Sequence, residues 1–403
     1  MPVKLLLQLS WRNLWRHRRR NTILLVAIAI AVSGVLLLNS MLRGMQVNMQ
    51  ETVIDNLTGH VKVLQPGYLD DPSIAHGFEV ARDWDLEIDP DAVVGWTSRI
   101  RVPAVIMSER ETRGVQLIGV DPARESISFL DDIVIDGEAL GSPEDRRVLV
   151  GAALAEQLQT KVGRRLVLIT QGADGRNREA GYRIAGVYRA EVAGLEKAFV
   201  FTGAETLKNM LDTLVVTEVS VRLVDDRFEP GILATMVDAF TGLDVLSWRD
   251  LEPQAAMIAE FMDTAVFIYF LVIMSALVFG LVNTLVTAVM ERVRELGMLR
   301  ALGMRPRSVV AQVVVESSLV MAVGVAGGVL IAAGVFALVA DGIDLTAFDE
   351  SLQSFGVRPQ FTPVMQAGDV ILVVVLSLVL GLLASFYPAR RAVKLRPLDA
   401  LRR

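Results

Sequence analysis

The segment MERVRELGMLRALGM, from Met290 to Met304, decides how the rest of the chain is organised. It follows directly on one long apolar run and shortly precedes another, which begins at Ser317. Because a dense charged patch cannot lie in hydrocarbon, the segment must lie in water between two membrane helices. Its glycines and alternating charges are more typical of a short helix that docks on another protein surface than of a plain linker. We therefore predict a coupling segment over residues 291–316.

Apolar residues are concentrated in a few long runs. The chain has 403 residues, of which 52% are hydrophobic and only 6% aromatic, more apolar than an average soluble protein. Four runs lack Asp, Glu, Lys and Arg, at residues 21–42, 264–290, 317–340 and 370–389. Each is near or above the roughly 20 residues that span a bilayer. The sequence predicts an α-helical membrane protein with four transmembrane helices.

The flanking charges predict the orientation. Arginines and lysines gather in residues 1–20, in the coupling segment and in residues 390–403, whereas the connection 341–369 is acidic. By the positive-inside rule both termini are cytoplasmic, and residues 43–263 form a large domain outside, inserted between the first two spans. A cleaved signal peptide is the alternative for the first run, but the run exceeds the usual roughly 7 to 15 residues. We expect a multi-pass protein of the bacterial cytoplasmic (inner) membrane.

Residues 1–20 have the pattern of an amphipathic helix at the membrane surface. Trp11 and Trp15 lie on one helix face, with Arg12 and Arg16 on the other. Such tryptophans lie at headgroup depth, and such arginines contact anionic lipid. On periodicity alone, a topology signal with no further role explains the segment equally well.

The outer domain mixes β-rich and helical runs, so we predict an α+β fold. Predicted strands are Val61–Leu64, Val102–Met107, Val115–Val120, Arg165–Thr170, Tyr182–Tyr188, Ala198–Phe201 and Glu218–Leu223. Predicted helices are Ala152–Leu158, Ala204–Leu211, Pro230–Phe240 and Leu251–Asp263, the last running into the second span. Asp174-Gly175 is typical of a hairpin turn. With no cysteine in the chain, this domain must be stabilised by its own core.

Small residues recur at every fourth position in three of the spans. The repeats contain Gly280 in the second span, Gly324 and Gly328 in the third, and Gly381 in the fourth. Small residues at this spacing favour close packing of membrane helices. The spans carry no charge, which argues against a proton or ion pathway at the midplane. Energy for any transport should therefore come from elsewhere.

Residues for catalysis are not visible. The sequence has no Gly-x-x-x-x-Gly-Lys-Ser/Thr phosphate loop and no His-Glu-x-x-His or Gly-x-Ser-x-Gly motif, and its three histidines form no zinc pattern. The acidic stretch 85–91 lacks the glycine and the distal glutamate of a calcium loop, so a solvated turn explains it better. We expect a non-enzymatic chain with no cofactor or metal of its own. The net charge of -6 argues against a nucleic-acid partner.

Several blocks resemble the FtsX-like permeases, the group that includes MacB, LolC and LolE. Asn283-Thr284 followed by Glu291-Arg-x-Arg-Glu-x-Gly-x-Leu-Arg-Ala-Leu-Gly303 is similar to the signature of this family. Four further segments are similar to this family and occur in the same order along the chain. They are Trp11-Arg-Asn-Leu-x-Arg16, Leu149 to Leu158, Trp248-x-x-Leu251 and Tyr387-Pro-Ala-Arg-Arg391. The resemblance implies a MacB-like periplasmic domain of two subdomains, with an insert at about residues 131–212. Because no ATPase domain precedes the first span, we expect the layout of the separate-subunit members.

The resemblance also implies the partners. A permease of this kind works as a dimer with a second permease, identical or homologous, and with two copies of a separate ABC ATPase, which bind the ATP and magnesium. The ATP cycle moves the outer domains by mechanotransmission. We expect a hydrophobic or amphipathic substrate, such as a lipoprotein, with a periplasmic carrier as a further candidate partner. The alternative is an FtsX-like signalling scaffold that activates an extracytoplasmic enzyme and transports nothing; a membrane enzyme has no residues to support it.

The coupling segment supplies the residues expected to contact the ATPase. The expected set is Glu291, Arg292, Arg294, Glu295, Gly297, Leu299, Arg300, Leu302 and Gly303. Glu291 with Arg294, and Arg292 with Glu295, are i, i+3 pairs that stabilise a helix by about 0.2 to 0.5 kcal/mol each. The pairs could have only that structural role. In the functional interpretation, the charges and leucines fill a cleft on the ATPase, while the two glycines let the chain turn.

Overall fold

A computed structural model describes residues 18–80, 91–131, 133–190, 193–291, 298, 305–340, 342–344 and 360–394. Its contacts divide the chain into two compact units. The helical unit contains Met1–Val47, Glu260–Asp344 and Gln360–Arg403, and the sheet unit contains Asn48–Ala259 and Leu345–Pro359.

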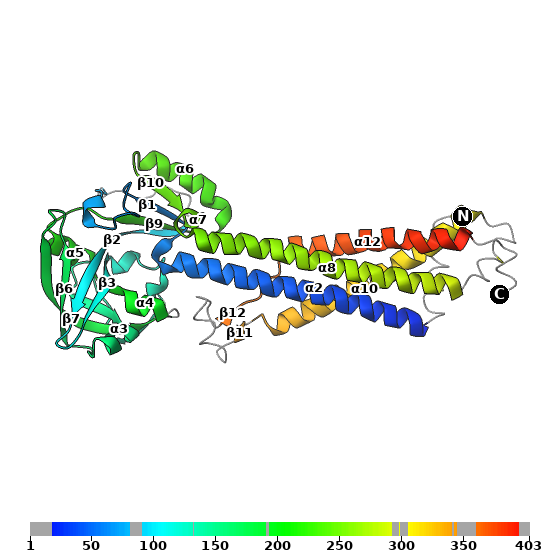
Figure 1. Cartoon of the computed structure of the whole chain (residues 1–403), viewed down its shortest axis with the longest axis horizontal. Helices are drawn as coiled ribbons and strands as arrows, with labels where there is room; N and C mark the ends of the chain where they lie inside the picture. The colour runs from blue at the N-terminus through cyan, green and yellow to red at the C-terminus, as the bar shows by residue number, and fades with distance from the viewer. Residues whose placement is uncertain are drawn as a thin grey trace. The chain divides into compact units, whose positions relative to one another are not determined.

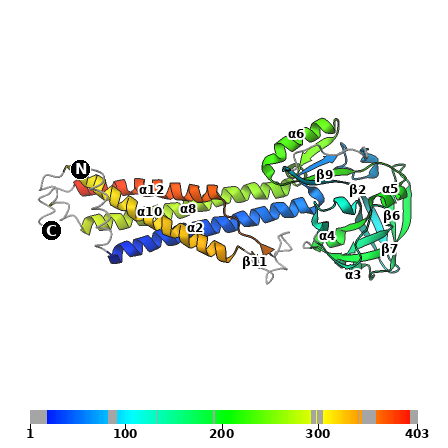
Figure 2. The same cartoon turned by 180° about the vertical axis from the view of Figure 1, so that it is seen from behind.

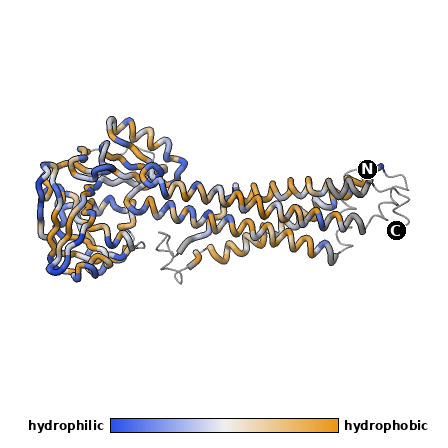
Figure 3. Tube along the Cα trace, viewed as in Figure 1, coloured by the Kyte–Doolittle hydropathy of each residue, from blue (hydrophilic) through white to orange (hydrophobic). Residues whose placement is uncertain are grey.

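The helical unit is built from long apolar helices. These are α2 (Arg18–Val53), α8 (Pro253–Glu291), α10 (Pro306–Leu338) and α12 (Ala367–Lys394), which lie alongside one another in Figures 1 and 2. All four are long and apolar enough to cross a membrane, with candidate spans Asn21–Thr58, Pro253–Gly280, Arg307–Leu338 and Ala367–Phe386. Figure 3 shows apolar residues along most of their length. A short pair of strands, β11 (Ile343–Asp344) and β12 (Gln360–Phe361), completes the unit.

The helices are longer than the apolar runs that predicted them. The first run ends at Leu42, yet α2 continues to Val53 through good helix formers such as methionine, glutamine and glutamate. The predicted helix from Leu251 is interrupted at Glu252, where α7 (Trp248–Leu251) ends. Because proline is well tolerated in the first turn of a helix, α8 begins at Pro253 and runs without a break into the second apolar run.

The helical unit has an apolar core that draws on all four long helices. Its buried residues are Leu24, Ile28, Val32, Val35 and Leu36 from α2, Met274 from α8, Val320, Met321, Val325 and Ala332 from α10, and Val373 and Ala384 from α12. Ser377 of α12 lies against the sulfur of Met274, 3.6 Å away. The four helices therefore pack as one bundle.

One ten-stranded sheet forms the frame of the sheet unit. Its strands are β1 (Val61–Leu64), β2 (Val93–Met107), β3 (Thr112–Val120), β4 (Val134–Gly137), β5 (Arg147–Gly151), β6 (Arg165–Gln171), β7 (Asn177–Arg189), β8 (Phe199–Gly203), β9 (Glu218–Leu223) and β10 (Asp244–Ser247). The helices are α3 (Ala152–Gln157), α4 (Ala193–Ala198), α5 (Ala204–Leu211), α6 (Glu229–Ala239) and α7. The mixture confirms an α+β fold for this unit.

Six of these strands close into a barrel. In order around it they are β2, β3, β8, β5, β7 and β6, and β6 pairs with β2 to complete the circuit. The long strand β2 has two roles, because Ile100–Met107 pairs with β3 while Val93–Arg99 pairs with β9. Beyond β2, the strands β9, β1 and β10 extend as an open sheet, and α6 packs against β1 and β10. The remaining strand, β4, pairs with β7.

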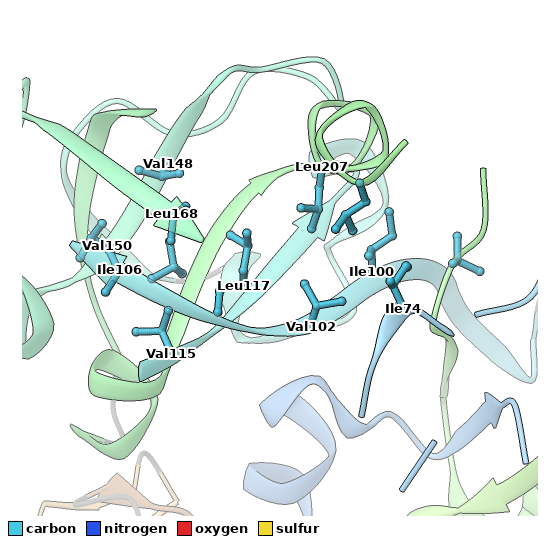
Figure 4. Packing of buried hydrophobic residues seen from close by; sticks show 14 of the residues in the cluster. Ile74, Ile100, Val102, Ile106, Val115, Leu117, Val148, Val150, Leu168 and Leu207 are labelled. Atoms are coloured by element: carbon cyan, nitrogen blue, oxygen red, sulfur yellow. The ribbon is translucent and has the colours of Figure 1, made fainter. Parts of the chain in front are cut away.

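The main core fills the space between these strands. Figure 4 shows Ile106, Leu117, Val150 and Leu168 gathered in one packed group, although they come from four different strands. All four side chains are fully inaccessible to solvent. Burying such side chains contributes roughly 1.5 to 3 kcal/mol each. The unit therefore has the independent core that a chain without cysteine requires.

Most predicted elements are present in the structure, several of them with other bounds, and β4, β5 and β10 are strands that the sequence did not predict. β1, β9 and α5 have the predicted bounds, and the Asp174-Gly175 turn joins β6 to β7 as a hairpin, with Gln171 paired to Asn177. Ala198 was expected in a strand but ends α4, so β8 begins one residue later. The expected insert at 131–212 covers β4 to β8, of which β5 to β8 share the barrel with β2 and β3.

Candidate functional site

The last residues of α2, 48–53, belong to the sheet unit and lead into a distorted turn. A π-helix, η1 (Ile54–Thr58), follows α2, and within it Leu57 has a left-handed backbone with φ of 71°. A left-handed leucine is strained and persists only where its surroundings hold it. Here the Leu57 carbonyl accepts a hydrogen bond from Arg99 at 3.0 Å, and Asp55 forms an ion pair with Arg222 of β9. Sheet contacts therefore determine where α2 ends.

A second set of contacts meets at Asp226, in the 3-10 turn η5 (Asp226–Phe228) that follows β9. Gln50, in the last turn of α2, donates to the Asp226 carboxylate at 2.5 Å, and His60 Nε2 lies 3.4 Å from it. Arg249 of α7 lies 3.4 Å from the same carboxylate and donates to Glu229 at 2.7 Å. We call these five residues the Asp226 junction. It connects the end of α2 with the turn that precedes α8.

Hydrogen bonding fixes the state of the histidine in this junction. The backbone N–H of Leu223 donates to His60 Nδ1 at 3.1 Å, so Nδ1 must be unprotonated. The ring proton is then on Nε2, where it is donated to Asp226. Hydrogen bonding to His60, followed by that to Gln50, lowers the pKa of Asp226 despite its partial burial. The carboxylate is thus charged at neutral pH and binds its three partners in that form.

The sheet unit also contains a buried group of charges. Arg99 donates to Glu125 at 2.9 and 2.8 Å and to Glu218 at 3.3 Å, and Lys62 lies 3.1 Å from the second oxygen of Glu218. Each of these four side chains is at most 5% exposed. We call them the Arg99 cluster. The two fully buried cations face two buried anions, as buried charges require, and the partly exposed Arg101 lies 3.9 Å from Glu218.

Burial and the neighbouring charges act in opposite directions on the pKa values in this cluster. Burial raises the pKa of Glu218, but the cations Lys62, Arg101 and Arg99 outweigh it and hold the pKa at about 2. Burial also lowers the pKa of Lys62 to about 8, because one carboxylate shared by three cations compensates it only in part. The cluster is therefore charged at neutral pH and is sensitive to both acid and base.

Three of the predicted packing glycines lie at close contacts between helices. A Cβ at Gly324 of α10 would lie 2.8 Å from Ile28, and one at Gly328 would lie 2.8 Å from the Ala29 carbonyl, both on α2. A Cβ at Gly381 of α12 would lie 2.4 Å from the Met321 side chain. At Gly280 of α8 the added atom would lie in open space among the residues that the structure describes.

Two family models together match most of the chain. The MacB-like periplasmic core domain matches residues 22–230, more than half of the 403, and the C-terminal part of the FtsX-like permeases matches residues 267–397. The chain belongs to the MacB-like, FtsX-type permease family. Four residues of the Asp226 junction lie within the first match, and Arg249 lies between the two matches.

Known relatives of this permease align with it over nearly its whole length. It is 24% identical to the lipoprotein-releasing system transmembrane protein LolC of Neisseria meningitidis serogroup B, over 94% of this chain and 92% of LolC. It is 23% identical to the macrolide export ATP-binding/permease protein MacB of Agrobacterium fabrum, over 98% of this chain but 60% of MacB. The crystallised periplasmic region of MacB from Actinobacillus actinomycetemcomitans aligns with 48% of this chain, at 10% identity and a TM-score of 0.35.

Other predicted site residues of this permease lie outside the described part of the chain. They are Trp11, Arg12, Trp15 and Arg16 at the membrane surface, and Arg292, Arg294, Glu295, Gly297, Leu299, Arg300, Leu302 and Gly303 in the coupling segment. Glu291 is the last residue of α8. Within the described ranges, no group of three or more His, Asp or Glu side chains could hold a metal ion.

The residues of the Asp226 junction and the Arg99 cluster were missed by sequence reasoning. Lys62, Arg99 and Glu218 lie in strands, where an isolated charge is usually exposed. One signal was available, because the predicted strand Glu218–Leu223 places a glutamate and a serine among buried valines. That pattern indicates a buried polar face, although it does not name the partners.

Proposed function

We propose that this chain is the permease subunit of an ABC transporter. In this proposal a separate ATPase binds ATP and magnesium in the cytoplasm, and its cycle moves the helices by mechanotransmission. The sheet unit lies outside the membrane, between the first and second spans, and both termini are cytoplasmic. The cargo is hydrophobic or amphipathic, and the LolC relative favours a lipoprotein extracted from the inner membrane.

The Asp226 junction is the observation that carries this proposal. Asp226 contacts Gln50 at the end of α2 and Arg249 in the turn before α8, so one carboxylate connects two segments that lead into candidate spans. A displacement of α2 relative to α8 would strain hydrogen bonds to a single residue. Because Asp226 lies three residues after the end of β9, and β9 pairs with both β1 and β2, that strain would pass to the sheet.

The coupling segment supports the cytoplasmic end of the same path. In the proposal, Glu295 and Arg300 contact the ATPase, with Glu291, Arg292 and Arg294 holding the segment helical. Gly297 and Gly303 shape its turns, and Leu299 and Leu302 fill the cleft. Glu295→Lys or Arg300→Glu would then abolish the coupling of ATP hydrolysis to movement without preventing membrane insertion.

The test is mass spectrometry of the proteins that co-purify with the chain from membranes in mild detergent, with Glu295→Lys in parallel. We expect an ATPase with the wild type that is lost with the variant, and a second permease that remains. An ATPase bound equally to both would contradict the docking role of the segment. Reconstitution with that ATPase then separates the two functions, because ATP-dependent lipoprotein release indicates transport, whereas hydrolysis without release favours a signalling scaffold.

A further inference from the structure

Two adjoining cavities in the helical unit form a groove with one polar end. The first, about 170 Å³, lies between α2, α8 and α12, and its lining includes Asn39, Arg43, Asp369 and Tyr269 among apolar residues. The second, about 540 Å³, lies between α8 and α12. Phe267 and Phe270 line both cavities, so the two adjoin at these side chains of α8.

The larger cavity is suited to hydrocarbon. Its described walls are apolar except for Ser275, and the Ser275 hydroxyl donates to the Leu271 carbonyl of its own helix at 2.7 Å. The wall therefore offers a ligand little polar chemistry. Along α8 the lining extends from Phe267 to Val282, which are fifteen residue steps or about 22 Å of helix apart. One leaflet is about 15 Å deep, half of the roughly 30 Å hydrocarbon core, so a whole acyl chain fits along the groove.

The polar end has charges of both signs. Arg43 lies 3.4 Å from the Asp369 carboxylate, and Asn39 donates to the same carboxylate at 3.0 Å. Both charged side chains keep part of their surface accessible, 29% for Arg43 and 21% for Asp369. The backbone holds the pair in place, since the Val364 N–H donates to the Ser40 carbonyl at 3.0 Å.

We infer that this groove binds a phosphatidylethanolamine molecule of the surrounding membrane. An arginine fork matches the oxygens of a phosphate, and a carboxylate accepts hydrogen bonds from a primary ammonium group. The phosphate contacts Arg43, the ethanolamine ammonium contacts Asp369, and one acyl chain lies between α8 and α12. The inference rests on the membrane location of the helices and is independent of ATP coupling and of the transported cargo.

The experiment uses the full chain in nanodiscs of equal phosphatidylethanolamine and phosphatidylglycerol, released into the gas phase for native mass spectrometry. We expect the wild type to retain phosphatidylethanolamine in preference to phosphatidylglycerol. Asp369→Asn should remove that preference, which we expect to be about tenfold because a hydrogen bond between charged groups is lost. Arg43→Gln should lower retention of both lipids.

Matched tryptophan variants test the groove itself. Leu380→Trp places a large side chain in the cavity, whereas Leu383→Trp lies on the same helix at a position that is 60% exposed and outside the lining. Retention should fall about tenfold for the first and stay unchanged for the second, with equal helix content by circular dichroism. Equal retention by both variants would overturn the inference. The inference would also be overturned if the wild type retained an acylated protein in place of the phospholipid and Leu380→Trp displaced that protein. The groove would then be a cargo site.

Discussion

Arg99 donates two parallel hydrogen bonds to Glu125, at 2.9 and 2.8 Å, in a place where neither side chain is more than 5% exposed. The same guanidinium also donates to the Leu57 carbonyl. One residue therefore both neutralises a buried carboxylate and holds the strained turn that follows α2.

Arg99→Leu should destabilise the sheet unit strongly. Removing one partner of a buried ion pair leaves an uncompensated charge, which costs about 3 to 5 kcal/mol. Thermal unfolding of the full chain in detergent measures this loss. The control is Arg113→Leu, because Arg113 and Glu111 are both exposed and such a pair contributes about 1 kcal/mol or less. Equal effects of the two variants would contradict the role of Arg99.

Acid should destabilise the sheet unit through Glu218. Its pKa of about 2 in the folded chain is below the ordinary 4.5, so the folded state binds fewer protons than the unfolded state. The resulting stabilisation is present above pH 4.5, is lost as the pH falls toward 2, and is on the order of 3 kcal/mol. Unfolding midpoints measured across this range should fall for the wild type. Glu218→Gln should be less stable at neutral pH and show a flatter profile.

Raising the pH should stabilise the sheet unit through Lys62. The pKa of Lys62 is lowered to about 8 from 10.5, so the unfolded state binds more protons between these values. This residue therefore contributes stability that increases as the pH rises from 8 to 10.5. Lys62→Met should remove that increase, and a rise that persists in the variant would assign it to another group.

Asp226→Asn should loosen the end of α2. The substitution keeps the shape of the side chain but removes the charge that faces His60 and Arg249. Hydrogen exchange of residues 48–60 should accelerate about tenfold, since hydrogen bonds to a charged group contribute about 1.5 to 3 kcal/mol. Under the proposed function, release of cargo should fall while ATP hydrolysis continues. Asp225→Asn is the matched control, because Asp225 pairs with the exposed Arg227 and not with the junction.

Gly328→Ala should separate α10 from α2. The new Cβ would lie 2.8 Å from the Ala29 carbonyl and 2.8 Å from Val32, which forces the backbones apart. At Gly334 of α10 an added Cβ would lie in open space among the described residues. Gly334→Ala should therefore stabilise the helix by up to about 1 kcal/mol through helix propensity, without a steric clash. Thermal stability in detergent should fall for the first variant and not for the second.

Periodicity predicted the regular parts of the fold. Apolar residues alternate in β1 and β9 with the period of a strand, and they recur in α5 with the period of a helix. The bounds of these three elements are the predicted ones. The first half of β2 escaped prediction because Thr97, Ser98 and Arg99 are polar, although Thr97 and Arg99 are buried. β5 is a short continuous apolar run, which periodicity alone does not distinguish from a helix.

The functional contacts depend on the tertiary fold. Lys62, Arg99 and Glu218 come together because β1 and β2 both pair with β9, an arrangement that no local pattern encodes. The glycine spacing indicated close helix packing, but only the structure shows that Gly324 and Gly328 lie against α2. At the polar end of the groove, Arg43 likewise contacts Asp369, although the two are 326 residues apart in the sequence.

The pairing of β1 with β9 also affects how the protein is made. Leu64 lies opposite Glu218, so 154 residues must be synthesised after β1 before its partner exists. At about 5 to 20 residues per second this takes roughly 8 to 30 s. Throughout that time β1 is a short unpaired strand that carries Lys62, a charge of the kind that discourages pairing with other chains. We therefore expect Lys62, which is buried in the folded chain, to discourage aggregation of the nascent chain.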